Sequence, residues 1–501
     1  MASPASPRGG RETAPVVVVG AGPVGLALAG ELRLGGARVT VLERRAAPVT
    51  ESRASTLHAR TMELFDSRGL LDDLGVPPHE PRGHFGGLPM DLTLPGRHPG
   101  QWKVPQARTE ELLAKRAVSL GADLRRGWDV TRLDDDGDDD GVTVTAATPD
   151  GERRLRAAYV VACDGEDSTV RRLTGAAFPG REARRELLRA DVAGIDIPPR
   201  RFERLPGGLA IAAGMPGEIT RVMVHAFGRR AERRAAAPGF AEVVEVWRRV
   251  TGEDIGHGRP VWVNAFGDAN RQLASYRHGR VLFAGDAAHV QMPSGGQALN
   301  LGLQDAFNLG WKLADAAGPR PVEGLLDTYH EERHAVGARV LANIRAQGAL
   351  LLGGPEVEPV RALFGELLAR EAVRARLAGA VSGLDVRYPV GEKDHPLLGA
   401  RLPHHELSPD GDRLTTTEAL RAGGGLLLVR AGRRHRHLRW VGGLWAGRVT
   451  TVAAGRDADP LFGTAGALLV RPDGYVAWAG ADGDGASGAL RRWFGPPGAG
   501  L

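Results

Sequence analysis

Cysteine is nearly absent from this chain. Cys163 is the single cysteine among 501 residues, so no intramolecular disulfide and no dithiol chemistry are available. That content fits a reducing compartment, and we expect a cytoplasmic protein. Also absent is any run of about 20 apolar residues, the length that a membrane span needs. The opening residues are polar and proline-rich and lack an apolar signal core, so we expect a disordered tail over residues 1–13.

Lysine is scarce too, and this affects how the positive charge is interpreted. It occurs only at Lys103, Lys115, Lys312 and Lys393, so nearly all of the basic residues behind the formal charge of +5 are arginines. The arginines are scattered rather than gathered into a stripe, and we therefore expect no nucleic-acid partner. Apolar residues make up 42% and charged residues 25% of the chain, which is typical of a globular protein with several domains.

Hydrophobic patterns predict a divided α/β architecture. Residues 15–44 read as strand, glycine-rich turn, helix and strand, and helices are expected over 57–74 and 110–120. Between residues 178 and 278, short alternating runs such as "RVMVHAFG" predict an inserted antiparallel sheet. Helical spacing dominates from 300 to about 377, and the last hundred or so residues return to strands with helices between them.

The first strand runs into a nucleotide-binding pattern. "VVVVGAGPVGLALAGEL" carries Gly20, Gly22 and Gly25 in G-x-G-x-x-G spacing, and a second strand ends at Glu43. Gly20 would permit the tight turn, Gly22 the approach of a pyrophosphate to a helix N-terminus, and Gly25 close packing of helix and strand. Glu43 lies where an acid would bind a ribose hydroxyl pair. This motif by itself does not separate FAD from NAD.

The choice between FAD and NAD depends on three further segments. "CDGEDSTVRRLTG" carries an Asp-Gly pair at Asp164 and Gly165, "GDAAHVQMPSGGQALN" a Gly-Asp pair at Gly285 and Asp286, and "PQARTE" a glutamine at Gln106. In this combination and order the chain resembles the class A flavoprotein aromatic hydroxylases, which share the p-hydroxybenzoate hydroxylase fold. The resemblance covers nearly the whole chain.

The resemblance implies how one long cofactor would be held. The AMP half of FAD would lie on the first βαβ unit. Asp286 would bind the ribityl chain, and the loop from Pro293 to Asn300 would place backbone N–H groups against the flavin, where a helix N-terminus favours negative charge. Arg44 and Arg53 fall where family members hold phosphates and approach NAD(P)H. The complete expected set is Gly20, Ala21, Gly22, Pro23, Val24, Gly25, Glu43, Arg44, Arg53, Gln106, Val130, Asp164, Gly165, Asp286, Pro293, Gly295, Gly296, Gln297, Ala298, Leu299 and Asn300.

Plainer alternatives exist for several of these residues. A helix cap would explain Asp286, and solvated surface arginines would explain Arg44 and Arg53. His289 is expected to be a packed structural histidine rather than a catalyst. Two departures from the family pattern stand out: Asp167 reverses the charge of a commonly basic position, and Ala298 replaces a glycine in the flavin loop, where an alanine would penalise positive φ.

The resemblance also predicts the domains. They are an FAD-binding Rossmann-like domain of the glutathione-reductase type over 14–178 and 280–385, the second part including a helical linker; an inserted substrate-binding antiparallel sheet over 179–279; and a thioredoxin-like domain over 386–501. The last cannot exchange disulfides with Cys163 alone, so a structural or dimerising role is expected, and a homodimer is considered.

The implied activity is a monooxygenase reaction. NAD(P)H would reduce non-covalently bound FAD, O₂ would form a flavin C4a-hydroperoxide, and one oxygen atom would enter a polycyclic aromatic substrate.

"GHFGGLPMDL" and "HPLLGARLPHHEL" look most like hydroxylases that tailor aromatic polyketides of the angucycline and anthracycline group, in antibiotic biosynthesis. Baeyer–Villiger insertion and antibiotic inactivation on the same scaffold stay open, as does NADPH versus NADH. No catalytic residue is named. Substrate contacts, for which plain sheet packing is the alternative, are expected from Leu205, Met215, Met223, His225, Phe227 and Trp262.

Two patterns suggest metals. "HEERH" (residues 330–334) has the spacing by which two histidines on one helical face bind zinc, with Glu331 as a base, so a zinc hydrolase is the alternative from a different class. No convincing third ligand stands downstream. "DGDDDG" places Asp136, Asp138 and Asp140 as in a calcium loop, but position twelve is Ala147 and a strand is expected next. We expect no metal at either.

Overall fold

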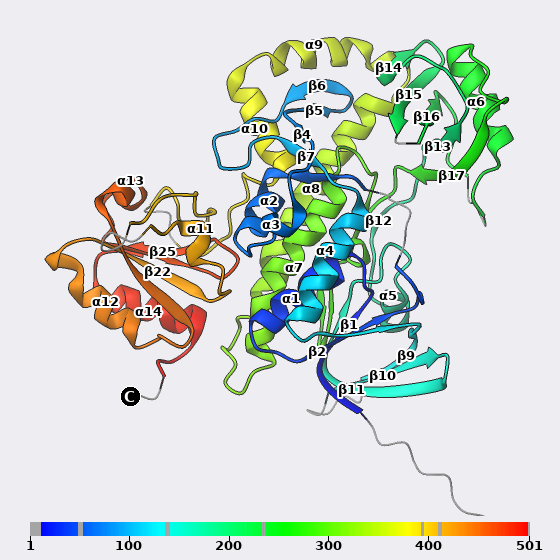
Figure 1. Ribbon diagram of the computed structural model, residues 1–501. Coiled ribbons are helices and arrows are strands. Elements are labelled where there is room, and N and C mark those ends of the chain that lie inside the picture. Colours follow the sequence, from blue (N-terminus) through cyan, green and yellow to red (C-terminus); the bar gives the residue numbers. More distant parts are fainter. Residues whose placement is uncertain are drawn as a thin grey trace, which may run out of the picture.

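The computed structural model describes residues 12–48, 54–135, 141–215, 217–232, 234, 236–391, 395–408 and 413–498. Figure 1 shows three parts: a large central layer of sheet and helices, a smaller sheet with one helix at the upper right, and a C-terminal αβ unit at the left. Among the described residues, no helix is both long and apolar enough to cross a membrane.

The central sheet is mostly parallel. Its strands run in the order β19-β20-β11-β1-β2-β8, with β10 beside β11 and β9 beside β10. Four adjacent pairs, from β20 to β8, are parallel, whereas β19, β9 and β10 pair antiparallel. The bounds are β1 Glu12–Val19, β2 Val39–Glu43, β8 Asp123–Arg126, β9 Asp129–Asp135, β10 Val142–Thr148, β11 Gly151–Ala162, β19 Arg277–His278 and β20 Val281–Phe283. Continuous β-branched runs such as Val16–Val19, buried on both faces, explain why β1 is central.

Helices cover this sheet and carry the longest buried stretch among the described residues. In α7 every residue from Leu299 to Ala314 is buried, because the helix packs between α1 and α8. Figure 1 shows α1, α4, α7 and α8 together in the centre. The bounds are α1 Pro23–Leu34, α2 Ala59–Asp66, α3 Leu71–Leu74, α4 Gln106–Ser119, α5 Thr169–Thr174, α7 Gln297–Ala316, α8 Thr328–Leu352, α9 Glu358–Leu368 and α10 Glu371–Ser382.

The predicted antiparallel sheet is present, in the order β14-β15-β16-β13-β17. Its bounds are β13 Glu186–Ala193, β14 Arg200–Leu205, β15 Gly208–Met215, β16 Ile219–Ala226 and β17 Arg259–Gly267. One face is covered by a helix that we did not anticipate, α6 (Phe240–Thr251), which buries Val243, Val246, Trp247 and Val250 against it. The i, i+3, i+4, i+7 spacing of these four residues is helical.

The C-terminal unit has a four-stranded sheet in the order β23-β22-β24-β25, with β22 and β23 parallel and the other pairs antiparallel. Its bounds are β22 Gly425–Arg430, β23 Val449–Ala454, β24 Ala467–Val470, β25 Val476–Gly480, α11 Thr416–Ala419, α12 Arg436–Gly443, α13 Asp459–Phe462 and α14 Gly483–Phe494. It packs on the central helices, because Trp311 of α7 shares a hydrophobic cluster with Trp493 and Phe494.

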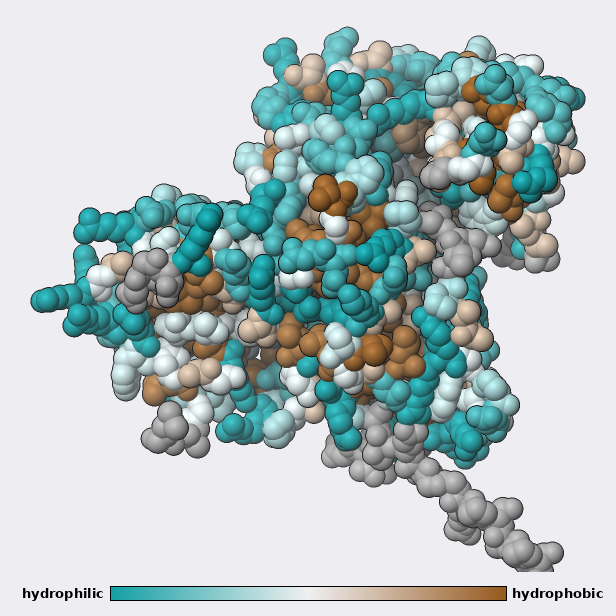
Figure 2. Space-filling view, in the orientation of Figure 1, coloured by the Kyte–Doolittle hydropathy of each residue, from teal (hydrophilic) through white to brown (hydrophobic). Residues whose placement is uncertain are grey.

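Small sheets connect these parts. The predicted helix over 57–74 is divided: it opens with a short strand, β3, before α2 and α3, because the segment pairs with β7. The bounds are β3 Thr56–His58, β4 His79–Glu80, β5 Arg82–Phe85, β6 Leu88–Asp91, β7 Gln101–Lys103, β12 Gly180–Arg181, β18 Asn270–Gln272 and β21 His289–Gln291. Figure 2 shows hydrophobic side chains gathered over the middle of the view, where Figure 1 has α1 to α4, within a largely hydrophilic face.

Candidate active site

Three turns of the sequence motifs meet at one edge of the central sheet. The parallel strands β1, β11 and β20 are neighbours, with Val19 opposite Ala162 and Ala162 opposite Phe283. The segments that begin at Gly20, Cys163 and Ala284 therefore leave the sheet side by side at its carboxyl edge. This is where ligands bind in open α/β sheets.

The first turn needs its glycines for steric reasons. Gly20 has a φ of +104°, and a Cβ there would lie 2.4 Å from the carbonyl oxygen of Cys163. A Cβ on Gly25 would lie 2.0 Å from the carbonyl oxygen of Gly20. Gly22, in contrast, has a φ of −74° and would place its Cβ in open space. Gly22 is therefore not required by the fold, and the space beside it is where a phosphate could approach α1.

Glu43 closes the same turn from the end of β2. Its Oε2 accepts a hydrogen bond from the Ala21 N–H at 2.9 Å, and its Oε1 accepts one from the Arg45 N–H at 3.0 Å. Arg44 is exposed beside it, and Arg53 lies outside the described residues. The carboxylate is thus held at the strand end by two backbone N–H groups, and its ribose-binding role stays a prediction.

The Asp164–Gly165 turn carries a buried oxygen that has no partner among the described residues. Asp164 Oδ2 accepts a hydrogen bond from the Val170 N–H at 3.0 Å, and the unpaired oxygen is Oδ1. Arg171 donates to the Ala287 carbonyl oxygen at 3.0 Å and stacks on Phe178, which ties this turn to the Gly285–Asp286 turn. An unpaired buried acceptor costs stability, so a donor from a bound group is expected there.

The Gly285–Asp286 turn packs on the first helix. Gly285 has a φ of +63°, and a Cβ there would lie 3.0 Å from Val24 Cγ2. Asp286 is exposed at this turn. The late and early motifs therefore lie against each other at one site, although more than 250 residues separate them in the sequence.

A buried carboxylate that we did not predict supports this turn. Asp305 of α7 accepts hydrogen bonds from the Gly285 N–H at 3.1 Å, His289 Nε2 at 2.7 Å and Arg333 Nε at 2.7 Å. Burial opposes its charge, but Arg333 and His289 hold the pKa of Asp305 below its ordinary value. His289 is completely buried, and this arrangement gives it the structural role that we expected.

The loop after β21 has two consecutive left-handed glycines. Gly295 and Gly296 have φ of +62° and +72°, and α7 begins at Gln297. Ala298 lies inside the helix, so the predicted penalty for positive φ does not arise. Asn300 donates to the carbonyl oxygens of Thr56 and Gly296 and accepts from the His58 N–H and Thr61 Oγ1. Asn300 therefore shapes the loop and uses its own hydrogen-bonding capacity to do so.

Two buried histidines, also unpredicted, face this loop. Burial lowers the pKa of His58 to about 4, against the opposing effect of the Gly295 carbonyl. Burial likewise lowers the pKa of His84 to about 4, and its ring packs on Phe202 with centroids 4.1 Å apart. Both rings are neutral near pH 7. The sequence did hold a signal for His58: "TLHART" places this histidine where a strand meets a helix, five residues after Arg53 of the family pattern.

The remaining expected cofactor contacts lie around this centre. Gln106 begins α4, accepts from the Ala54 N–H at 3.2 Å and donates to Glu110. Val130 lies in β9 with its side chain in the main hydrophobic core. Gln297 is buried, and its Oε1 has no partner in the described part of the chain.

Taken together, these features fit FAD. They are an open helix N-terminus at Gly22, a held carboxylate at Glu43, an orphaned acceptor at Asp164 and a glycine loop at the start of α7. The comparisons with known proteins agree. The family model described as "FAD binding domain" matches residues 13–344, and that described as "Aromatic-ring hydroxylase, C-terminal" matches residues 395–497.

The chain belongs to the FAD-binding aromatic-ring hydroxylases. A Streptomyces rimosus relative, "12-dehydrotetracycline 5-monooxygenase/anhydrotetracycline 6-monooxygenase", is 44% identical over 96% of this chain and 99% of its own. The structure of CabE, "an aromatic hydroxylase from angucycline biosynthesis", is similar with a TM-score of 0.91 and 48% identity, over 97% of this chain and 99% of the other. The structure of BexE, from a study of "oxidation during BE-7585A biosynthesis", matches with a TM-score of 0.91 and 49% identity over the same shares. The protein is an FAD-dependent monooxygenase.

The five-stranded sheet of the monooxygenase divides the expected substrate residues between its faces. Met223 lies on the face opposite α6, in a cluster with Met292, the residue before the flavin loop. His225 is two residues after Met223 in β16 and therefore lies on this same face. Trp262 of β17 is next to Val263, which packs under α6, so Trp262 also points to the face opposite α6. His225 Nδ1 lies 2.8 Å from the Glu186 carbonyl oxygen.

Leu205 and Met215 lie away from this surface, whereas Phe227 follows His225 by two residues and packs edge-on against its ring. Leu205 packs on the cluster under α6, away from the flavin loop. Met215 is 37% exposed at the tip of the β15–β16 hairpin. Phe227 lies beneath the guanidinium of Arg204, 4.6 Å from ring centre to carbon. The one-letter alternation of a strand does not show which face another element will cover, which is why these residues were included.

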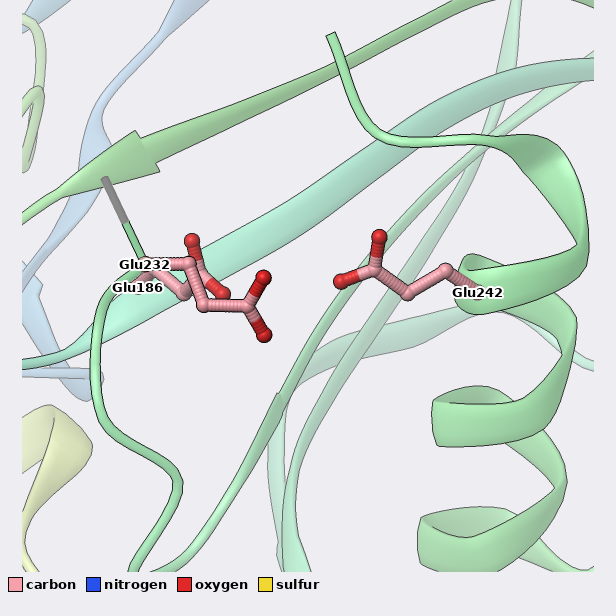
Figure 3. A group of neighbouring side chains, drawn as sticks. All are labelled: Glu186, Glu232 and Glu242. Atoms are coloured by element: carbon pink, nitrogen blue, oxygen red, sulfur yellow. The ribbon is translucent and has the colours of Figure 1, made fainter. Parts of the chain in front are cut away.

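The two histidines of HEERH have structural partners in the monooxygenase. His330 Nδ1 accepts from the Tyr276 N–H at 3.2 Å, and His334 Nε2 lies 3.1 Å from the Leu273 carbonyl oxygen. Within the described residues, the one group of acidic, histidine or cysteine side chains close enough for a metal is elsewhere, at Glu186, Glu232 and Glu242. Figure 3 shows their carboxylates turned toward one another. Arg229 and Arg234 form ion pairs with all three, so these carboxylates already have cationic partners.

Two other features of the sequence are the calcium-like pattern and the single cysteine. Residues 136–140 of the calcium-like pattern lie outside the described residues, and the flanking strands β9 and β10 form an antiparallel hairpin. Cys163 is buried against the Gly25 backbone, and burial raises the pKa of its thiol. A protonated buried thiol is a poor nucleophile.

Proposed function

We propose that the monooxygenase uses NAD(P)H and O₂ to insert one oxygen atom into an electron-rich ring of a polycyclic aromatic polyketide, as a step of antibiotic biosynthesis. The observation that carries this proposal is the meeting of the three motif turns at the ends of β1, β11 and β20. The relatives named for tetracycline and angucycline oxidation support the substrate class.

The proposed binding of FAD follows the strand ends. Its pyrophosphate would lie at the N-terminus of α1 beside Gly22, where backbone N–H groups and the helix dipole favour an anion. Glu43 would bind the adenosine ribose, Asp286 the ribityl chain, and Arg44 with Arg53 the phosphates and the nicotinamide cosubstrate. When bound, FAD supplies hydride acceptance from NAD(P)H and activation of O₂.

The loop at the start of α7 would serve the reactive end of FAD. Gly295 and Gly296 turn their backbone at the first turn of a 20-residue helix, where unpaired N–H groups favour negative charge on the reduced ring. The neutral rings of His58 and His84 add no charge beside it. Neither is assigned a proton transfer.

Water exclusion is the second task of the protein. The apolar cluster of Leu187, Leu209, Met292, Ile344, Leu351 and Leu352, with Met223 and Phe266 at its margin, closes the side between the inserted sheet and the loop. A dry site favours oxygen transfer over release of peroxide. In this arrangement Met223, His225 and Trp262 are the proposed substrate contacts.

The proposed domain boundaries follow the same assignment: 14–178 with 280–385 for FAD, 179–279 for substrate, and 386–501 for a thioredoxin-like unit. The mixed order of β23, β22, β24 and β25 between helices supports the last. Its role would be structural, since Cys163 lies in another unit. A cytoplasmic location and a homodimer stay predictions.

The test is aerobic turnover with a panel of anthraquinones, anthracyclines, angucyclines and tetracyclines. Purified protein should be yellow and release FAD on denaturation. With an accepted substrate, consumption of NADPH or NADH should give a product heavier by one oxygen atom, labelled from ¹⁸O₂. Product NMR separates ring hydroxylation from Baeyer–Villiger insertion, and a growth assay separates biosynthesis from inactivation. Peroxide as the sole product with every panel member would contradict the proposal.

A further inference from the structure

Arg189 is a buried cation that no motif explains. It lies in the middle of β13, with 6% of its surface exposed. Its neighbours across the sheet are Met223 of β16 and Asn264 of β17, each directly opposite. Directly opposite residues of an antiparallel pair have Cβ atoms about 5 Å apart, so these three side chains form one row on one face.

That face is the one turned toward the flavin loop. Leu188 and Ala190, on either side of Arg189, belong to the cluster under α6, so Arg189 points the other way. The adjacent row on its face includes Leu187, which packs with Met292. Met292 directly precedes Pro293. Arg189 therefore belongs to the surface that would cover the substrate.

Polar atoms in this row have no hydrogen-bond partner. Arg189 Nε and Nη2 and Asn264 Oδ1 are buried and unpaired in the described part of the chain. The nearest carboxylate is Asp191, whose Oδ1 lies 3.9 Å from Arg189 Nε, too far for a hydrogen bond. Asp191 instead binds Arg221 through two hydrogen bonds of 2.7 Å.

The guanidinium is nevertheless held in a defined position. It stacks on the Trp262 ring at 4.4 Å, a geometry that occupies one face of the guanidinium and leaves its N–H edge available. Burial and Arg221 lower the pKa of Arg189 to about 10, partly offset by Asp191, so the group remains a cation near pH 7. Unpaired buried donors of this kind cost stability, which a bound oxygen would recover.

We propose that Arg189 and Asn264 form an oxygen-recognition pair that orients the aromatic substrate. Arg189 Nε–H and Nη2–H donate to a carbonyl or phenolate oxygen, and Asn264 Oδ1 accepts from a neighbouring phenolic O–H. The ligand class is therefore a polycyclic aromatic with a carbonyl and a hydroxyl group on adjacent positions of fused rings. This inference rests on the proposed function and deepens it, because it selects which edge of the substrate faces the sheet.

The experiment compares 1,8-dihydroxyanthraquinone with 1,8-dimethoxyanthraquinone as probes. Each is titrated into flavin-loaded protein, and binding is followed by the change in flavin absorbance. In the unchanged protein we expect the hydroxylated probe to bind about tenfold more tightly, because the ether lacks the phenolic O–H that would donate to Asn264 Oδ1.

The variants are Arg189→Met, Arg189→Lys and Asn264→Leu. Arg189→Met should weaken both probes about ten- to a hundredfold, because both keep the carbonyl oxygen that accepts from the guanidinium. Arg189→Lys should restore part of the affinity for both probes, and Asn264→Leu should bring the ratio of the two dissociation constants close to one. Arg249→Met, an exposed position on α6 at the other face, is the matched control and should bind as the unchanged protein does.

Flavin content and thermal unfolding of each variant show that it is folded. Folded, flavin-loaded Arg189→Met protein with an unchanged affinity for both probes, or Asn264→Leu protein with an unchanged preference for the hydroxylated probe, would overturn the recognition pair and leave the proposed function standing. If no panel member, including both anthraquinones, binds or is turned over by the unchanged protein, the proposed function fails and this inference fails with it.

Discussion

Single residues in this monooxygenase divide into those that shape the site and those that face it. Asp305, His289 and Asn300 are buried and use their hydrogen bonds within the protein. Asp286 and Arg44 are exposed at strand ends. Because a substitution at an exposed position leaves the buried packing in place, the second kind is where substitutions should change flavin binding while preserving the fold.

Replacing Asp286 by alanine should yield largely flavin-free protein. The proposed ribityl contact sits at an exposed turn, so its loss removes a ligand contact and leaves the core intact. The ratio of absorbance at 450 nm to that at 280 nm after purification measures occupancy, and Asp286→Asn, which retains hydrogen-bonding capacity, should keep part of it. Full flavin occupancy of the alanine variant would refute the assignment.

Acidification should destabilise the protein between about pH 6.5 and pH 4. The folded-state pKa values of His58 and His84, about 4 each, lie below the ordinary 6.5. The unfolded chain therefore binds more protons in this interval, and stability is lost as the pH falls through it. Each ring could contribute up to about 3 kcal/mol. Lys103, which faces both rings, and Arg201, which faces His84, reinforce the preference for neutral rings.

The measurement is the thermal unfolding midpoint of the protein against pH. His58→Gln should flatten the acid side of the curve, since glutamine does not titrate. His257→Gln, at an exposed position, is the control and should leave the curve unchanged. An identical pH profile for His58→Gln and the unchanged protein would contradict this explanation.

At the scale of elements, the junction of β1 and α1 shows how one turn can satisfy both packing and binding. Gly20 and Gly25 are demanded by backbone contacts with neighbouring turns, whereas Gly22 faces open space. The same G-x-G-x-x-G spacing therefore contains two structural glycines and one that is available to a ligand.

Gly20→Ala and Gly22→Ala should consequently have different effects. The alanine at position 20 would combine a φ of +104° with a 2.4 Å contact to the Cys163 carbonyl oxygen, and should cost more than about 2 kcal/mol of stability. The alanine at position 22 should leave the flavin-free protein as stable as before and weaken FAD roughly tenfold or more, because its Cβ occupies the approach of the pyrophosphate. Urea unfolding of flavin-free protein and fluorescence titration with FAD measure the two effects. Equal FAD affinity for Gly22→Ala would argue against a pyrophosphate at this turn.

For the whole molecule, a buried ionic network joins the C-terminal unit to the central helices. Arg471 donates to both carboxylate oxygens of Glu332 in α8, and Lys312 of α7 donates to the same carboxylate at 2.8 Å. Burial opposes the charge of Glu332, but Arg471 and Lys312 lower its pKa to about 2. The C-terminal unit thus contributes a cation that the central helices need.

Glu332→Gln should destabilise the protein by about 3–5 kcal/mol, because Lys312 and Arg471 would stay buried without their shared anion. Glu331→Gln, one residue earlier and exposed, is the matched control and should change the free energy of unfolding by less than about 0.5 kcal/mol. Chemical denaturation measures both. Activity retained in Glu331→Gln would also speak against a zinc hydrolase, which needs that carboxylate as its base. A small effect of Glu332→Gln would show that the network is dispensable.

The sequence by itself determined the parts of this protein that depend on local geometry. Runs of β-branched residues, the spacing of the glycines and the residues at strand ends predicted β1, α1, β2 and β11 and the three motif turns. These patterns are readable because backbone sterics act within a few residues. The inserted antiparallel sheet followed from its period of two. These same local patterns, with the resemblance they carry, were enough to predict FAD.

Only the tertiary structure decided which residues meet. Asp305 supports Gly285 from 20 residues away in the sequence, His58 faces a loop more than 230 residues later, and α6 decides which face of the sheet is covered. Leu205 and Met223 look alike as strand residues, yet they lie on opposite faces. Arg189 and Asn264 carry no motif at all, and their unpaired atoms became visible only once the register of β13 and β17 was known. Burial and pairing are properties of the packed chain, so local pattern could not supply them.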